Sequence, residues 1–164
     1  MRTVIFAMGM AVSASSFAQH EHQTAGQSGY AGMQARDIKA LSAEQIADLR
    51  EGKGMGASLP AELNGVPGPL HVLQLKDRLA VTPEQQLQLE RITEDMKADA
   101  QRLGEEVVAA ETELDRAFKS GKADESLIIS TSARIARLQG QLRAVHLVAH
   151  LKTRQVLSDQ QVTH

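Results

Sequence analysis

Two series of mainly apolar residues with helical spacing occupy the second half of this chain. In the second series the steps alternate between three and four over four heptads: Ile128, Thr131, Ile135, Leu138, Leu142, Val145, Ala149, Lys152 and Val156. This spacing is typical of a helix that packs lengthwise against another helix. A helix of roughly 35 residues would be about 50 Å long at ~1.5 Å per residue.

The first series has the same steps, with one position missing near Asp99. It comprises Leu89, Ile92, Met96, Leu103, Val107, Ala110, Leu114 and Phe118. The stretch Ser120-Gly121-Lys122 then interrupts the pattern, which predicts a tight turn between two long helices. We therefore expect an all-α fold, a long antiparallel helical hairpin over residues 69–164 with short flanking helices. The lack of Trp and the single Tyr favour helices that pack through Leu, Ile, Val and Ala.

A lone hairpin buries little surface per residue. A short helix expected over residues 69–80 can cover part of the seam between the long helices, and a second copy of the chain can cover the rest. We therefore expect an intertwined homodimer, with a self-contained small bundle as the alternative.

The first residues have the features of an export signal. Arg2 precedes an apolar stretch, and Ser16-Phe17-Ala18 fits a small-x-small cleavage site. We expect residues 1–18 to be a signal peptide cleaved after Ala18, so that the protein is periplasmic. Residues 19–33 are interpreted as a flexible arm rich in His, Gly and Ser, and residues 34–68 as a short helix followed by a Gly- and Pro-rich loop. The chain has no cysteine, which excludes disulfides and thiolate metal sites.

One five-residue phrase occurs three times, at 41–45, 81–85 and 157–161. Each copy has an apolar residue, a hydroxyl residue, two variable positions and a glutamine. The hydroxyl can accept a hydrogen bond from the backbone N–H three residues on, and the glutamine can reach back to the N–H of the hydroxyl residue. Each phrase therefore predicts the start of a helix.

The second and third phrases, together with export and the hairpin, resemble the LTXXQ-motif family of periplasmic proteins. Val81 replaces the usual leucine and Ser158 the usual threonine, and the resemblance covers about residues 69–164. It implies a dimer of curved helical hairpins that works in envelope stress. Some members of this family are Spy/CpxP-like chaperones that hold unfolded clients without ATP. Others bind transition metals and report their excess in heavy-metal resistance, with a membrane-bound sensor as a partner.

Three histidines are candidate metal ligands. His146 and His150 are four residues apart, so they lie on one face of the last long helix, one turn apart. That spacing suits two imidazoles on one Zn, Ni, Co or Cu ion. His71, in the first turn of the short helix, could complete a three-histidine site, with water or the carboxylate of Glu90 or Glu94 as a further ligand. The family resemblance supports this layout, because its metal-sensing members use histidines from the first helix and an i, i+4 pair on the last.

Other interpretations of the histidines stay open. His146 and His150 could simply be polar residues at the edge of the seam. His20 and His22, in the arm, could load metal weakly or only solvate the terminus.

Other functional classes fit less well. The chain has 18 Lys and Arg against 20 Asp and Glu, a balance that does not suggest nucleic-acid binding. It has no phosphate-binding Gly-rich loop after a strand, no Gly-x-Ser-x-Gly and no His-Glu-x-x-His, so we do not expect an enzyme.

The main alternative to metal sensing is an ATP-independent chaperone. Its client surface would consist of the exposed side of the seam, namely Met96, Leu103, Val107 and Leu114, although these residues could equally be core. A basic rim of Arg134, Arg137 and Arg143 could attract acidic clients or could pair with acids of the neighbouring helix.

Overall fold

The computed structural model describes residues 30–163. The chain divides into two compact units, Met1–Ala31 and Gly32–His164, and all helices of the described part belong to the second unit. Within residues 30–163 the regular elements are all helices, with no strand. The predicted signal peptide and nearly all of the predicted arm lie outside the described residues. None of the helices in the described part has the length and apolarity needed to cross a membrane.

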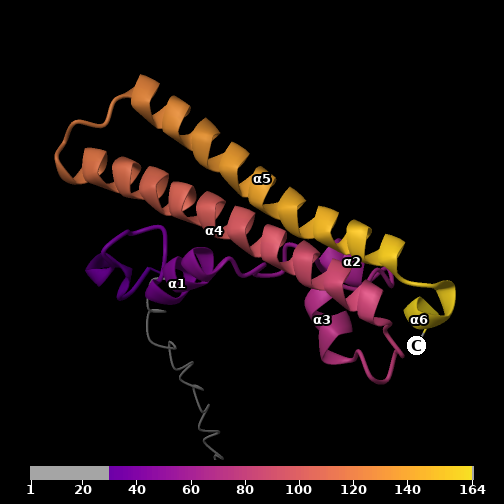
Figure 1. Cartoon of the computed structure of the whole chain (residues 1–164). Coiled ribbons are helices and arrows are strands. Elements are labelled where there is room, and N and C mark those ends of the chain that lie inside the picture. The colour runs from indigo at the N-terminus through magenta and orange to yellow at the C-terminus, as the bar shows by residue number, and fades with distance from the viewer. Residues whose placement is uncertain (1–29, 164) are drawn as a thin grey trace, which may run out of the picture. The chain divides into compact units, whose positions relative to one another are not determined.

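Two long helices form the predicted hairpin. Helix α4 (Pro83–Lys119) and helix α5 (Glu125–Val156) pack antiparallel along much of their length (Figure 1). The Thr82 side chain begins α4 by accepting a hydrogen bond from Gln85 N, and Asp124 begins α5 in the same way, with Leu127 N as donor at 2.8 Å. The helices end and begin close to the residues that the spacing predicts, so the all-α hairpin is confirmed.

The main core lies between the two long helices and the segment that precedes them. Residues from both series are buried there, together with apolar residues of the N-terminal segment: Ile38, Leu41, Leu49, Ala100, Leu103, Val107, Val108, Ala110, Ile135, Leu138 and Leu142. The middle of the predicted seam is therefore the core of the hairpin, whereas Phe118 at the end of the first series is 59% exposed. A third layer covers part of this core.

That third layer is helix α1 (Ala43–Glu51), which packs on α4. The contact is close because α4 has a glycine at the crossing. A Cβ placed on Gly104 would lie 2.1 Å from the carbonyl oxygen of Leu49. Only a residue without a side chain allows the two backbones to approach this closely.

The segment before α1, at the start of the range 34–68 in which a short helix is predicted, is not α-helical. It contains only a short 3₁₀ turn, η1 (Met33–Ala35), and the α-helix begins after Ser42, whose side chain accepts from Gln45 N. The bend between them is held to α4, since Lys39 N donates to Asp115 Oδ1 at 3.2 Å. Ser42 and Gln45 form a capping box, a reciprocal pair of hydrogen bonds that ends α1 at its N-terminus. The residues before Ser42 are therefore not α-helical, and tertiary contacts such as that of Lys39 with Asp115 order them.

A loop that we call the strap, residues 52–68, connects α1 to helix α3 (Pro69–Gln74). It contains one short helix, α2 (Leu59–Glu62), which contacts α5.

The helix predicted over residues 69–80 is shorter in the structure. It ends at Gln74, and turns continue to Ala80, which has a positive φ of 47°. The last element, α6 (Asp159–Thr163), follows α5 after Leu157. Leu157 packs with Val72 and Leu89 in a second, smaller core at the open end of the hairpin.

Candidate functional site

A cavity of about 650 Å³ lies where the strap and α3 meet α4 and α5. All three predicted histidines, His71, His146 and His150, line it. The same cavity is lined by the carboxylates of Glu51 and Glu62, among other residues. The fold thus brings together a ring from α3 and two rings from α5, which are separated by more than 70 residues in the sequence.

The two histidines of α5 are buried under the strap. His146 and His150 are each only 5% exposed. The strap passes over them at two glycines: a Cβ on Gly54 would lie 3.3 Å from His146 Nδ1, and one on Gly68 would lie 2.8 Å from His150 Nε2. Glycine at these two positions gives the rings their space.

Backbone and side chain of the strap hold the ring of His150. Its Nδ1 lies 2.8 Å from the carbonyl oxygen of Val66, and because a carbonyl can only accept, Nδ1 carries the hydrogen. In the neutral ring Nε2 is then left with a lone pair. This nitrogen lies 3.7 Å from Glu62 Oε1, which also accepts a hydrogen bond of 2.8 Å from Ser58 Oγ.

His146 has a buried nitrogen that is not hydrogen bonded. Its Nε2 finds no hydrogen-bond partner among residues 30–163. Burial lowers the pKa of His146, and the neighbouring His150 lowers it further, and this direction favours the neutral ring. An unsatisfied buried polar atom costs about 1–3 kcal/mol. Such an atom calls for an explanation, and a ligand that uses the lone pair of a neutral imidazole supplies one.

The other predicted ligands lie at the rim of the cavity or outside it. His71 is exposed in the first turn of α3, at the rim of the cavity. Glu90 is half-buried on α4, does not line the cavity, and accepts a hydrogen bond of 2.7 Å from Gln86 Nε2. Glu94 is exposed and does not line it either. The predicted His20 and His22 lie outside the described residues.

Sequence reasoning missed Glu62, the carboxylate that faces His150. It lies in a Gly- and Pro-rich loop, where no periodicity indicates which side chain points inward. The only local signal is Pro60, which favours the start of a short helix and so places Glu62 at its end. Within the part of the chain that the structure describes, no three His, Asp or Glu side chains are already arranged as a metal centre. The cavity therefore offers two buried rings and a nearby carboxylate rather than a finished ligand shell.

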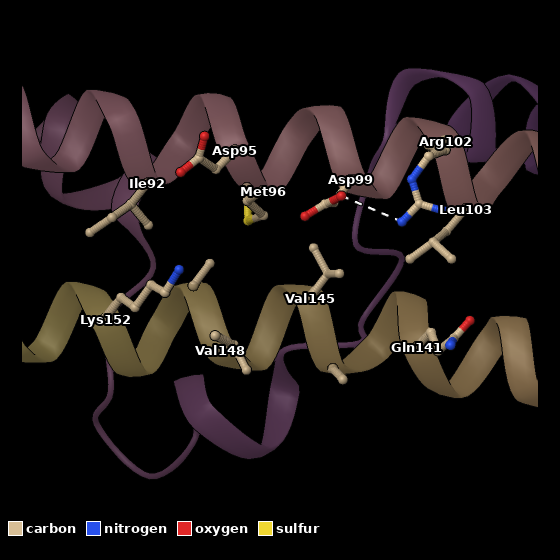
Figure 2. A pocket seen from close by; sticks show the side chains of 12 residues that line it. Ile92, Asp95, Met96, Asp99, Arg102, Leu103, Gln141, Val145, Val148 and Lys152 are labelled. Atoms are coloured by element: carbon tan, nitrogen blue, oxygen red, sulfur yellow. Dashed lines mark hydrogen bonds and ion pairs between the residues drawn. The ribbon is translucent and has the colours of Figure 1, made fainter.

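A second cavity, of about 400 Å³, lies between α4 and α5. Figure 2 shows Ile92 and Met96 of α4 on one side and Val145, Val148 and Lys152 of α5 on the other.

The client surface and basic rim considered for a chaperone are only partly available. Two residues of that client surface, Leu103 and Val107, are only 3% and 1% exposed. They belong to the core. Arg134, considered as part of a basic rim, pairs with Glu113 of α4 at 3.0 Å.

We compared the chain with protein-family models, curated proteins and solved structures, and none of them matches it. Its function is therefore inferred from the residues of these two cavities.

Proposed function

We propose that this chain is a periplasmic, non-enzymatic metal-binding or metal-sensing protein of envelope stress or heavy-metal resistance. The observation that carries the proposal is the buried Nε2 of His146, which lacks a hydrogen-bond partner within residues 30–163 and lies one helical turn from His150. Two imidazoles at this spacing can bind one transition-metal ion. His71, at the rim of the same cavity, could join them or deliver the ion.

The chemistry of the donors limits the class of metal. Imidazole nitrogens suit Zn, Ni, Co and Cu, and the carboxylate of Glu62 adds an oxygen donor. The chain has no cysteine, so a thiolate site is excluded. The hydrogen bond from His150 Nδ1 to Val66 O is the kind of contact that orients a metal-binding imidazole and fixes its tautomer.

The cellular setting is proposed from the sequence. The export signal expected over residues 1–18 supports a periplasmic protein, and the resemblance to the LTXXQ-motif family supports both that location and a homodimer. In a sensing role, a membrane-bound sensor would be its partner.

The test is a calorimetric titration of the protein with zinc, nickel, cobalt and copper, repeated with the double variant His146→Ala/His150→Ala. We expect micromolar or tighter binding of at least one metal and loss of that binding in the double variant. The matched control is His71→Ala, which should weaken binding less because His71 is exposed. Binding that survives in the double variant would show that the metal site lies elsewhere.

The alternative is an ATP-independent chaperone, and one observation favours it. Val148 and Leu151 of α5 are 47% and 56% exposed, and Val148 borders the cavity in Figure 2. A client could bury this apolar surface. The test is suppression of the aggregation of a reduced client without ATP, compared with Val148→Ser/Leu151→Ser. Lack of suppression at several-fold molar excess would count against this role.

A further inference from the structure

We infer that a divalent transition-metal ion bound at His146 and His150 also binds Glu62, and so clamps the strap onto α5. The inference rests on the proposed metal site and adds to it a ligand and a mechanical consequence. The strap would then be the part of the chain that changes when the ion binds.

The first support is the distance between two donor atoms. His150 Nε2 and Glu62 Oε1 are 3.7 Å apart, which is too long for a hydrogen bond. Two ligands of a tetrahedral zinc ion, each bonded at about 2.0–2.1 Å, lie about 3.3 Å apart. A shift of a few tenths of an ångström would therefore let one ion bind both atoms.

The second support is that the two atoms are already oriented. His150 Nδ1 donates to Val66 O, which leaves the Nε2 lone pair for a metal. Ser58 Oγ donates to Glu62 Oε1 at 2.8 Å and holds the carboxylate on the side of the ring. Outer hydrogen bonds of this kind orient metal ligands.

The third support is that the strap is only lightly held. None of the four residues of α2 is buried, and most of the hydrogen bonds that the strap backbone makes are to other residues of the strap, such as Ala57 N to Gly54 O and Val66 N to Ala61 O. Segments with few buried apolar contacts open at low free-energy cost. A metal bond from Glu62 would add a strong link between α2 and α5.

The resulting ligand set contains two imidazole nitrogens and one carboxylate oxygen. This set suits Zn²⁺, Co²⁺ or Ni²⁺, with a fourth position left for water or for His71 at the cavity rim. The binding of an ion at buried rings is thereby converted into a change at the surface of the protein, where a partner can detect it.

The experiment is hydrogen exchange of backbone amides in residues 53–68 of the full-length chain, with and without zinc. At free zinc of about ten times Kd, mass action should slow exchange through strap opening about tenfold. Glu62→Gln keeps the shape of the side chain but removes the charge. It should weaken zinc binding by about 10- to 100-fold. Even when zinc is raised to the same multiple of its new Kd, the strap of this variant should show no slowing.

The matched control is Glu51→Gln, because Glu51 also lines the cavity but pairs with Lys53 at 2.9 Å. It should behave like the unmodified chain. If zinc binds through the histidines but Glu62→Gln keeps both its affinity and its slowed exchange, the strap inference is wrong and the metal site stands. If zinc does not bind, or binds equally well to His146→Ala/His150→Ala, the proposed function fails together with the inference.

Discussion

The side-chain amides of Gln85 and Gln161 hydrogen bond to each other in both directions, each Nε2 donating to the other Oε1 at 3.0 Å. Each amide also donates to a backbone carbonyl across the open end of the hairpin: Gln85 to Val156 O at 2.8 Å and Gln161 to Leu79 O at 3.1 Å. Both glutamines come from the repeated phrase. These two glutamines, which close the capping boxes at Thr82 and Ser158, thus also join the start of α4 to the end of α5.

This pair predicts that Gln161→Ala destabilises the protein by about 1–3 kcal/mol, because partly buried polar groups lose their partners. The neighbouring Gln160 is exposed and makes no such contact, so Gln160→Ala should change the free energy of unfolding by less than about 0.5 kcal/mol. Urea unfolding of both variants measures the difference. Equal effects of the two substitutions would mean that the amide pair does not join the helices.

The crossing of α1 over α4 predicts that Gly104→Ala is strongly destabilising. The added methyl carbon would lie 2.1 Å from the Leu49 carbonyl oxygen, so α1 must move away from the core. Overpacking costs about 1–3 kcal/mol and occasionally more, and a clash between two backbones belongs at the upper end. Gly140 of α5 is the control, since a Cβ there meets nothing within 4 Å. Gly140→Ala should leave stability unchanged or raise it by up to about 1 kcal/mol, as measured by thermal unfolding.

The hairpin could be predicted from the sequence because each of its features is local. The apolar spacing, Pro83 after a Thr82 cap and the break at Gly121 place both long helices to within a few residues. The crossing at Gly104 could not be predicted, since a glycine inside a helix looks only like a weak helix former until its partner backbone is known. The packing of α1 on the core depends on this close approach between the backbones at Gly104 and Leu49.

The residues of the candidate site could likewise be predicted from the sequence only in part. The i, i+4 spacing of His146 and His150 is visible in the sequence, and so is the position of His71 just after Pro69. The role of Glu62 depends on the path of the strap, and that path is set by contacts with residues more than 80 positions away, such as Val66 O with His150 Nδ1. Periodicity contains no information about such contacts, so Glu90 and Glu94 on a regular helix were predicted instead.

Asp115 predicts a pH dependence of stability. A hydrogen bond from Lys119, and a weaker one from Lys39 N, lower the pKa of the Asp115 carboxyl group in the folded protein. A carboxyl group whose pKa is lower when folded stabilises the protein above its unfolded pKa, and this contribution is lost as the pH falls through the folded pKa. Asp115→Asn should therefore be less stable than the unmodified chain at pH 7, and the difference should shrink below about pH 4.

Urea unfolding midpoints between pH 7 and pH 3 test this prediction. Asp95→Asn is the control, because Asp95 is an exposed carboxylate of the same helix. Its difference from the unmodified chain should be small at every pH. A pH-independent effect of Asp115→Asn would mean that the charge of Asp115 does not tie the N-terminal segment to α4.

Gly68 allows the proposed metal site to be tested without changing a ligand. Its backbone is extended, with φ −84° and ψ 155°, so alanine fits there without backbone strain. Its added methyl carbon, however, would lie 2.8 Å from His150 Nε2, the atom proposed to bind the ion. We expect Gly68→Ala to turn the ring away and to weaken zinc binding at least about tenfold, a cost of about 1.4 kcal/mol.

Two comparisons separate this effect from a general loss of structure. Gly54→Ala brings a methyl carbon only to 3.3 Å from His146 Nδ1, so it should weaken zinc binding less than Gly68→Ala does. Gly140→Ala, which lies on the same helix as both histidines but in open space, should not change the affinity at all. Calorimetric titration of the three variants gives the order of affinities. If Gly68→Ala binds zinc as tightly as Gly140→Ala does, the prediction that a methyl carbon at residue 68 displaces the ring of His150 from the ion is wrong.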